Sequence, residues 1–342
     1  RVFRKSESVV LVKRILIGGV HLDPSRPDIS QWIRLNHLSQ FRITKLTWLA
    51  GRKYVNRDRK EIMKKYDDHY EAEYNLRARH PDFETYFERW QSDSAHARNS
   101  LPCSLDQQYG DGPNMSLDIF PQPGTSHPIV LFIHGGYWRA MDKNSFAYPA
   151  IGLNDAGVVY VSVNYALAPS VTLDEIVEQC RQAVVWVHQN AEKYGGDPDR
   201  IHISGHSAGG HLTAMMLSTD WAKLGAAEIK LAGGIAISGI FELVPLLETS
   251  INDGVQLDQT AALRNSPSAF VPSNGPPMIA AVGANETDEF LRQFREYAEA
   301  WNAQIGNGQY LPLKGFHHFD VVCELGRTGS ELNDAVLAQI GL

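Results

Sequence analysis

The sequence contains few cysteines and no long apolar segment. Its 342 residues include three cysteines, at positions 103, 180 and 323, which are too few and too scattered for a disulfide framework or a zinc cluster. No apolar run reaches the ~18 residues needed to span a bilayer. Residues 9–20 come closest, but Lys13 and Arg14 interrupt them, so they also make a poor signal-peptide core. We therefore expect a protein of a reducing, cytoplasmic compartment.

Motifs for nucleotides and catalytic metals are also missing. No Gly-x-Gly-x-x-Gly fingerprint is followed by an acidic residue, and no Walker loop occurs. His202, His206 and His211 do not form the His-Glu-x-x-His pattern of a zinc hydrolase. The sequence therefore predicts no cofactor, neither a nucleotide nor a metal.

Charge is distributed unevenly along the chain. The net charge is −7, but residues 1–60 hold 14 Lys and Arg against 4 Asp and Glu, whereas residues 61–342 hold 18 against 35. A basic arm can bind nucleic acid or a membrane. It can also lie against its own acidic body or form a poorly ordered tail, and we favour this second interpretation because charge runs are usually solvated faces. We therefore expect neither nucleic acid nor a membrane as a partner.

Composition and local character divide the chain into two parts. Hydrophobic residues make up 43% and charged residues 21%, as in ordinary globular proteins, so a sizeable core can form. We expect a basic N-terminal extension over residues 1–60, helical or partly disordered, and one domain over residues 61–342. Within that domain, residues 61–100 have helical character with few β-branched residues.

From residue 107 onward, strand-like and helix-like segments alternate. Two short strands are expected around the turn signal at 110–114. The expected strands are residues 107–109, 115–120, 129–133, 158–163, 201–204, 231–237, 278–282 and 310–313. Helical periodicity is clear over residues 173–187 and 290–301. The alternation predicts the α/β class, with a mostly parallel central sheet and helices on both faces.

The sharpest motif is Gly205-His206-Ser207-Ala208-Gly209, which follows an expected strand and precedes a helix expected over 211–217. Gly-x-Ser-x-Gly in this position is typical of a nucleophile elbow, a turn so tight that its neighbours must be small. The serine hydroxyl then projects above the sheet. A glycine-rich turn without chemistry is the alternative that this motif alone leaves open.

A second glycine motif lies upstream, directly after the strand expected at 129–133. Hydrolases of this architecture need backbone N–H groups aimed at the developing oxyanion, and glycines let the backbone approach closely. Gly135 and Gly136 are the candidate donors, together with Ala208 just after the serine. We expect His134, which precedes them, to be a structural histidine that holds the loop.

A serine nucleophile also needs a base and an acid that orients the base. Glu286 follows the strand expected at 278–282, with Asp288 two residues on, and His317 and His318 follow the last expected strand. An acid or a histidine in an exposed loop is usually just solvated. The two glycine motifs, the acid and the histidine occur together, each after an expected strand and in the chain order serine, acid, histidine. Chance does not readily produce this combination.

This combination resembles the α/β-hydrolase superfamily and, more closely, the arylformamidase (kynurenine formamidase) and related esterase group. The resemblance rests on HGGYW at 134–138, NYALAP at 164–169, GHSAGGH at 205–211, ETDEFLRQ at 286–293 and HFD at 318–320, with YG at 109–110 and LDIF at 117–120. It covers about residues 65–342, and the first 60 residues have no counterpart. Tyr137 stands where lipase-like esterases have a third glycine, which favours the HGGYW group.

Carried over position by position, the resemblance implies that Ser207 is the nucleophile. His318, the histidine directly before Phe319, matches the base. Glu286 falls where the family's acid lies; many relatives have Asp there, so Asp288 stays the alternative acid.

The resemblance implies a serine hydrolase that transfers a small acyl group from a carboxylic ester to water through an acyl-enzyme. An N-formyl aryl amide such as N-formylkynurenine is the alternative substrate, because the same machinery cleaves it and specificity depends on the pocket. Tyr137 and Trp138 are candidates for lining that pocket, with plain core packing as the alternative. Homo-oligomerisation stays open. A non-catalytic binding protein on a hydrolase scaffold is the competing interpretation, and the complete set of motifs argues against it.

Overall fold

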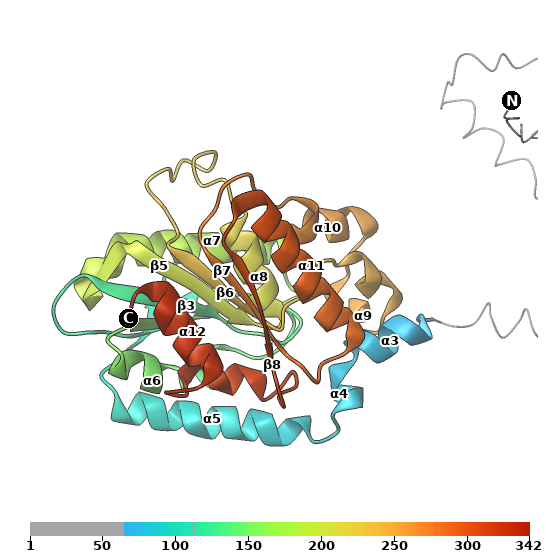
Figure 1. Ribbon diagram of the computed structural model, residues 1–342, viewed down its shortest axis with the longest axis horizontal. Helices are drawn as coiled ribbons and strands as arrows, with labels where there is room; N and C mark the ends of the chain where they lie inside the picture. Colours follow the sequence, from blue (N-terminus) through green and yellow to red (C-terminus); the bar gives the residue numbers. More distant parts are fainter. Residues whose placement is uncertain (1–64, 113) are drawn as a thin grey trace, which may run out of the picture. The chain divides into compact units, whose positions relative to one another are not determined.

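An eight-stranded sheet organises the part of the chain that the structure, a computed structural model, describes: residues 65–112 and 114–342 (Figure 1). Its strands are β1 (Ser104–Gln108), β2 (Ser116–Phe120), β3 (His127–Ile133), β4 (Val159–Val163), β5 (Gly196–His206), β6 (Gly233–Ile237), β7 (Met278–Gly283) and β8 (Gly308–Leu313). They lie in the order β1-β2-β4-β3-β5-β6-β7-β8. The extension expected over residues 1–60 lies outside the described residues.

The sheet is parallel except at one edge, as the alternation of strands and helices predicts. β1 pairs with β2 and β2 with β4 in antiparallel fashion, and every other neighbouring pair is parallel. Each expected strand has an observed counterpart. The largest difference is β5, which begins at Gly196 rather than at residue 201, because Gly196 pairs with His127 at the start of β3. This early part of β5 is too polar to be detected as a buried strand.

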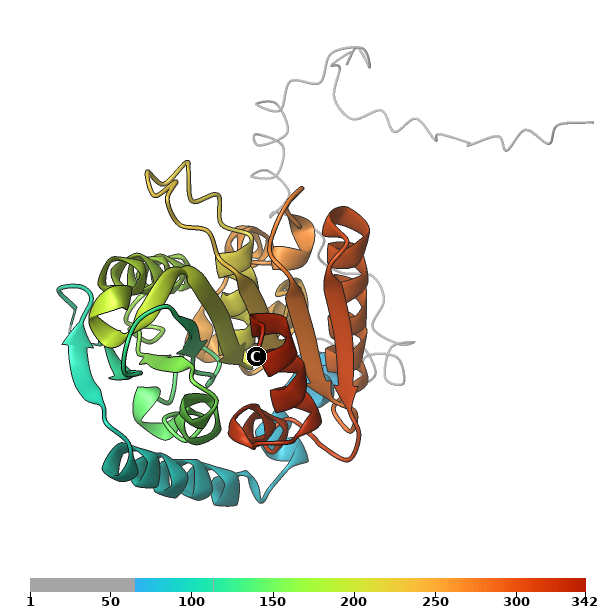
Figure 2. The same ribbon diagram turned by 60° about the vertical axis from the view of Figure 1, so that its left-hand side comes forward.

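Helices cover both faces of the sheet. The helices of the described part are α3 (Asp68–Tyr74), α4 (Leu76–Arg79), α5 (Phe83–Ser100), α6 (Ala150–Asp155), α7 (Leu173–Asn190), α8 (Ala208–Leu217), α9 (Asn252–Val255), α10 (Gln259–Arg264), α11 (Asp288–Ile305) and α12 (Glu331–Ile340). Figures 1 and 2 show α6 and α12 on one face and α7, α8 and α11 on the other. The α/β class with helices on both faces is thus confirmed. None of the described helices is long and apolar enough to cross a membrane.

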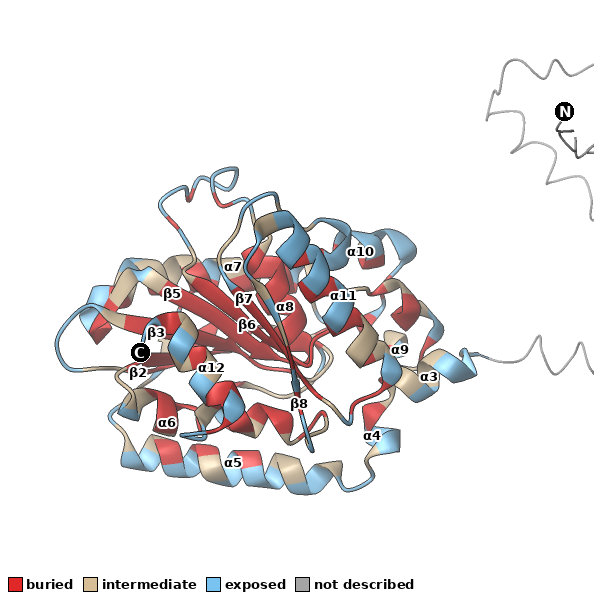
Figure 3. Cartoon of the chain, in the orientation of Figure 1, coloured by how far each residue is buried: buried red, intermediate tan, exposed pale blue. Residues whose placement is uncertain are grey.

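The core lies between the sheet and these helices. Figure 3 shows buried strands throughout the centre of the sheet and helices with exposed outer faces. The apolar stripe of α7 is buried as its 3.6-residue period requires, and the helix begins with a capping box between Thr172 and Glu175. The stripe of α11 is buried in the same way, from Phe290 to Trp301.

The three helices α3, α4 and α5, which we call the helical cap, are attached to the loops at the carboxyl edge of the sheet. The hydroxyl of Thr287, just before α11, donates a hydrogen bond to the backbone oxygen of Glu73 at 3.0 Å. The hydroxyl of Tyr137 donates one to the backbone oxygen of Tyr74 at 2.6 Å. The helical character expected for residues 61–100 is confirmed over the cap, and the cap lies where the motif-bearing loops meet.

The register of the parallel strands brings those loops together. Ile133, at the end of β3, pairs with Gly205 near the end of β5. The end of β6 is in register with β5 on one side and β7 on the other, and Gly283 at the end of β7 pairs with Leu313 at the end of β8. Because parallel strands end at the same edge, the segments that follow them converge there.

Candidate active site

Ser207 lies in a tight turn between β5 and α8. Its φ of +58° and ψ of −119° form a strained conformation that non-glycine residues adopt mostly at functional sites. A Cβ on Gly205 would lie 2.3 Å from the carbonyl oxygen of Gly209, and a Cβ on Gly209 would lie 1.9 Å from that of Ile133. The turn therefore needs glycine at both positions, which is why the sequence signature of an elbow is so restrictive.

A carboxylate and an imidazole meet beside this turn. Nδ1 of His318 lies 2.8 Å from Oε2 of Glu286, and both side chains are buried. The other carboxylate oxygen of Glu286 accepts hydrogen bonds from the N–H of Gly283 at 2.9 Å and from the hydroxyl of Ser238. Since the carboxylate accepts the Nδ1 proton, Nε2 of His318 is left with its lone pair free. Asp288, by contrast, is an exposed residue at the start of α11.

The two adjacent histidines point in different directions. His317 contacts the helical cap: its Nε2 lies 3.1 Å from the hydroxyl of Tyr86, and its ring stacks on His80 at 4.3 Å between centroids. His318 instead lines a cavity together with Ser207. Within the described residues no hydrogen bond joins the Ser207 hydroxyl to His318. Such a bond in an active site often forms only when substrate binds.

His206, the residue before the serine, supports the loop that carries His318. Its Nε2 donates a hydrogen bond to the backbone oxygen of His318 at 2.8 Å, and the two rings lie 4.7 Å apart. Burial, reinforced by the nearby His318, holds the pKa of His206 well below its ordinary value, so the ring is neutral. The elbow thus positions both Ser207 and, through His206, the loop of His318.

The glycine loop after β3 lies directly against Ser207. A Cβ on Gly135 would lie 3.0 Å from the Ser207 Cβ, so only glycine allows this approach. Gly136 lines the cavity with φ +104°, a left-handed conformation suited to glycine. Neither the N–H of Gly136 nor that of Ala208 donates a hydrogen bond within the described residues. The three residues expected to supply oxyanion donors therefore lie beside the serine.

The structure separates the two aromatic residues of the loop. Tyr137 lines the cavity, whereas Trp138 is fully buried and donates its indole N–H to Nδ1 of His211 at 3.2 Å. The expectation that Trp138 lines a pocket is therefore not met; it is a core residue. His134 is buried, donates from Nδ1 to the backbone oxygen of Gly135 at 2.8 Å and has a pKa lowered to about 4 by burial, as fits a structural histidine.

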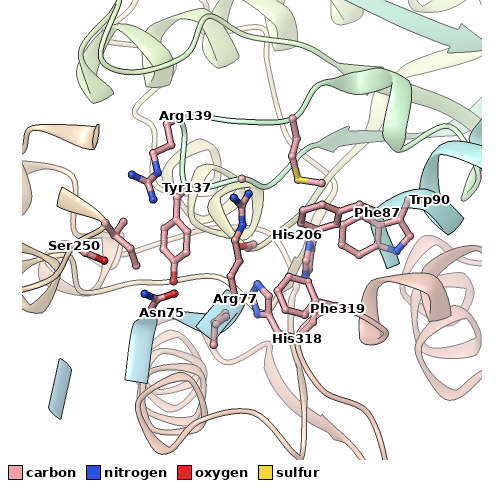
Figure 4. A pocket seen from close by; sticks show the side chains of 15 residues that line it. Asn75, Arg77, Phe87, Trp90, Tyr137, Arg139, His206, Ser250, His318 and Phe319 are labelled. Carbon is pink, nitrogen blue, oxygen red and sulfur yellow. The ribbon is translucent and has the colours of Figure 1, made fainter. Parts of the chain in front are cut away.

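The cavity above Ser207 has a volume of about 80 Å³ and is closed partly by the helical cap. Figure 4 shows the cap residues Asn75, Arg77, Phe87 and Trp90 facing Tyr137, His206 and His318 across it. On this measure a single water needs roughly 10–15 Å³, so the space beside the serine suits a small group. The helical cap, which is not part of the loops that follow the strands, therefore covers part of the candidate site.

Several of these residues were not identified from the sequence. Ser238 follows β6 directly and has φ +48°, but nothing in its sequence context indicates that its hydroxyl contacts Glu286. The motif that contains His206 does not indicate its contact with the loop of His318. Arg77 and Phe87 lie in a segment for which the sequence predicts only helical character. Their place in the cavity is a tertiary contact that hydrophobic periodicity cannot reveal.

Known proteins are similar to this chain in sequence and fold. A family model described as BD-FAE matches residues 117–293, more than half of the chain. The kynurenine formamidase of Salmo salar is 34% identical over 253 residues, which cover 72% of this chain and 84% of that protein. The chain belongs to the BD-FAE family of α/β-hydrolases.

Other relatives of this BD-FAE hydrolase are esterases. Esterase LipQ of Mycobacterium tuberculosis is 29% identical over 250 residues, 66% of this chain and 59% of that protein. A crystal structure of a putative thioesterase from a Silicibacter species aligns with a TM-score of 0.65 at 32% identity, covering 76% of this chain and 94% of that one. The resemblance read from the motifs is thus confirmed, and the protein is a hydrolase.

Proposed function

We propose that this hydrolase cleaves carboxylic esters with small acyl groups, using Ser207 as nucleophile, His318 as general base and Glu286 as the orienting acid. The observation that carries the proposal is the 2.8 Å contact between His318 Nδ1 and Glu286 in the wall of the cavity that Ser207 lines. A buried carboxylate on Nδ1 selects the tautomer in which Nε2 can accept a proton.

In the first half of the reaction, the Ser207 oxygen attacks the ester carbonyl while its proton moves to Nε2 of His318. The carbonyl oxygen becomes an oxyanion, which the N–H groups of Gly135, Gly136 and Ala208 stabilise. Glu286 stabilises the imidazolium. When the tetrahedral intermediate collapses, the proton passes to the departing alcohol and the acyl group remains on Ser207.

In the second half, water replaces the alcohol. His318 removes a proton from the water as its oxygen attacks the acyl-enzyme, and a second oxyanion forms at the same N–H groups. Collapse breaks the bond to Ser207, returns the proton to its oxygen and releases the carboxylic acid.

A second candidate activity is hydrolysis of N-formyl aryl amides. The kynurenine formamidase relatives favour it. The alignment with this chain covers a larger share of each of those relatives than of the mycobacterial esterase. The formyl group is the smallest acyl group, and a cavity of about 80 Å³ accommodates it easily. The mechanism is unchanged, with an arylamine as the leaving group.

A substrate panel separates the two activities. We would measure kcat/KM for 4-nitrophenyl esters of rising acyl length and for N-formylkynurenine, each with the wild type and with Ser207→Ala. We expect acetyl and propionyl esters to be cleaved fastest among the esters, and Ser207→Ala to be inactive on every substrate. A higher kcat/KM for N-formylkynurenine than for any ester would make the formamide the primary substrate. Optimal activity on long-chain esters would contradict both candidates.

A further inference from the structure

Two arginines line the cavity that contains Ser207 and His318. Arg77 reaches it from α4 in the helical cap, and Arg139 from the loop after the glycine motif. Figure 4 shows the two side chains entering from the cap and from the loop, with Tyr137 between them. No Asp or Glu is found among the described residues that line this cavity. The wall next to the nucleophile is therefore positively charged, although residues 61–342 hold 18 basic against 35 acidic residues.

Neither guanidinium group has a hydrogen-bond or ion-pair partner. Within residues 65–112 and 114–342, the guanidinium groups of Arg77 and Arg139 make no ion pair and donate no hydrogen bond. In contrast, Arg264 and Arg292, which lie outside the cavity, each contact a carboxylate at 3.0 Å or less. A guanidinium group carries five N–H donors in a planar fork that matches a carboxylate.

Arg77 is held in place without using those donors. Its guanidinium carbon lies 5.3 Å from the ring centroid of Phe83 and 5.5 Å from that of Phe87, within the range of cation–π contacts. The pKa of Arg77 is lowered, first by partial burial and then by the nearby charge of Arg139. Two like charges have been brought within electrostatic reach of each other. Asp253 lies within electrostatic reach of Arg139 but forms no ion pair with it.

Two acidic groups of neighbouring segments, Glu71 and Asp253, already have partners. Glu71 accepts hydrogen bonds from the backbone and side chain of Ser250 at 2.7 and 2.6 Å. Asp253 pairs with Lys65 at 2.6 Å and also accepts a hydrogen bond from Tyr66. Neither carboxylate lines the cavity, so an anion in direct contact with the two guanidinium groups there has to come with the substrate.

We propose that Arg77 and Arg139 form a subsite for a carboxylate, so that the enzyme prefers esters or amides that carry a carboxylate group in addition to the scissile bond. This inference rests on the proposed function, because the subsite is defined by its position beside Ser207. A neutral substrate would leave both guanidinium groups without an anion, whereas an anionic one would gain charge-assisted hydrogen bonds.

The test compares substrates that differ only in this charge. The pairs are acetoxybenzoate against acetoxybenzamide and formamidobenzoate against formamidobenzamide, each as the 3- and 4-isomer. The variants are Arg77→Gln, Arg77→Lys and Arg139→Gln. Arg79→Gln is the matched control, since Arg79 lies on the same short helix and does not line the cavity. The measured quantity is kcat/KM for the anionic substrate divided by that for its neutral partner.

For the wild type we expect a ratio above one that falls as salt is added, because both arginines are exposed at the mouth of the cavity. Each Gln variant should lower the ratio about tenfold, mainly through KM of the anionic substrate, the scale of one hydrogen bond to a charged group. Arg77→Lys should lower it less, and Arg79→Gln should leave it unchanged. A general distortion of the cavity would lower kcat/KM for the anionic and the neutral substrate alike and leave their ratio unchanged.

Two outcomes overturn the subsite: a wild-type ratio of one or less in every pair, or Gln variants that keep the wild-type ratio. In either case hydrolysis that still depends on Ser207 would leave the proposed function intact. Failure of the proposed function has a different signature, namely a Ser207→Ala protein that cleaves both members of a pair at the wild-type rate.

Discussion

Replacing Glu286 by Gln removes one negative charge from the candidate site and keeps the size of the side chain. In the native protein one carboxylate oxygen accepts hydrogen bonds from the Gly283 N–H and the Ser238 hydroxyl, and the other accepts the Nδ1 proton of His318 at 2.8 Å. A glutamine has a single oxygen, which these two donors will retain. Its NH₂ group will therefore face His318 Nδ1.

An NH₂ group cannot accept the Nδ1 proton. His318 will be held in the opposite tautomer, with its proton on Nε2, and Nε2 can then no longer take the proton of Ser207. The corresponding acid-to-amide change in a serine protease triad lowers kcat by about 10⁴, or about 5.5 kcal/mol of transition-state stabilisation, and we expect a loss of that size for Glu286→Gln.

The assay is kcat on 4-nitrophenyl acetate together with the melting temperature of each variant. Asp288→Asn is the matched control: Asp288 is exposed in the first turn of α11, where its charge interacts with the helix dipole. We expect it to keep wild-type kcat and to lose a few tenths of a kcal/mol in stability. A folded Glu286→Gln protein within tenfold of wild-type kcat would refute the reasoning, and an inactive Asp288→Asn protein would transfer the role to Asp288.

Three further predictions follow from the site and the core. His318→Ala should lose at least about 10³-fold in kcat, whereas His317→Ala, whose ring faces the helical cap, should keep a substantial fraction; the reverse pattern in a kinetic comparison would move the base by one residue. Gly136→Ala should lower both kcat and melting temperature, because its Cβ would lie 2.1 Å from a backbone carbonyl oxygen at φ +104°. Gly225→Ala, at φ +77° with no atom within 4 Å, should cost about 1–2 kcal/mol of stability and leave kcat unchanged; equal kcat losses in the two variants would contradict the role of the loop. Finally, the free energy of unfolding should fall by about 4 kcal/mol between pH 7 and pH 5.5, because three buried histidines take up protons only on unfolding in this range. Their pKa values are lowered by burial from 6.5 to about 4: His134, His202 and His211. Urea titrations at the two pH values check this, and a flat profile would mean that these rings are not buried as neutral groups.

The arrangement of the candidate site is largely predictable from the sequence because the fold is a parallel sheet. Segments that follow buried strands must meet at the carboxyl edge, so Ser207, Glu286 and His318 could be grouped without knowing any distance. The elbow is predictable for a steric reason, since only glycine fits at 205 and 209. Helix boundaries such as that of α7 follow from apolar period and a capping box.

What the sequence does not reveal depends on contacts between distant segments. Tyr137 and Trp138 are adjacent and chemically similar, and both have a positive φ, of +48° and +57°, yet one lines the cavity and the other packs in the core. The presence of Arg77 in the cavity depends on how the cap packs on segments more than 200 residues away, such as the contact of Tyr74 with Glu289. Neither periodicity nor motif spacing contains that information.

The most direct test of the account is the site of covalent labelling by an alkyl fluorophosphonate, which reacts with activated serines. Mass spectrometry of the labelled protein should show one adduct per chain, on the peptide that contains Ser207, and hydrolytic activity should fall in proportion to its formation. Ser207→Ala should take up no label, and His318→Ala should label far more slowly because its serine has no base. An adduct on any other residue, or loss of activity without an adduct on Ser207, would contradict the assignment of Ser207 as the nucleophile.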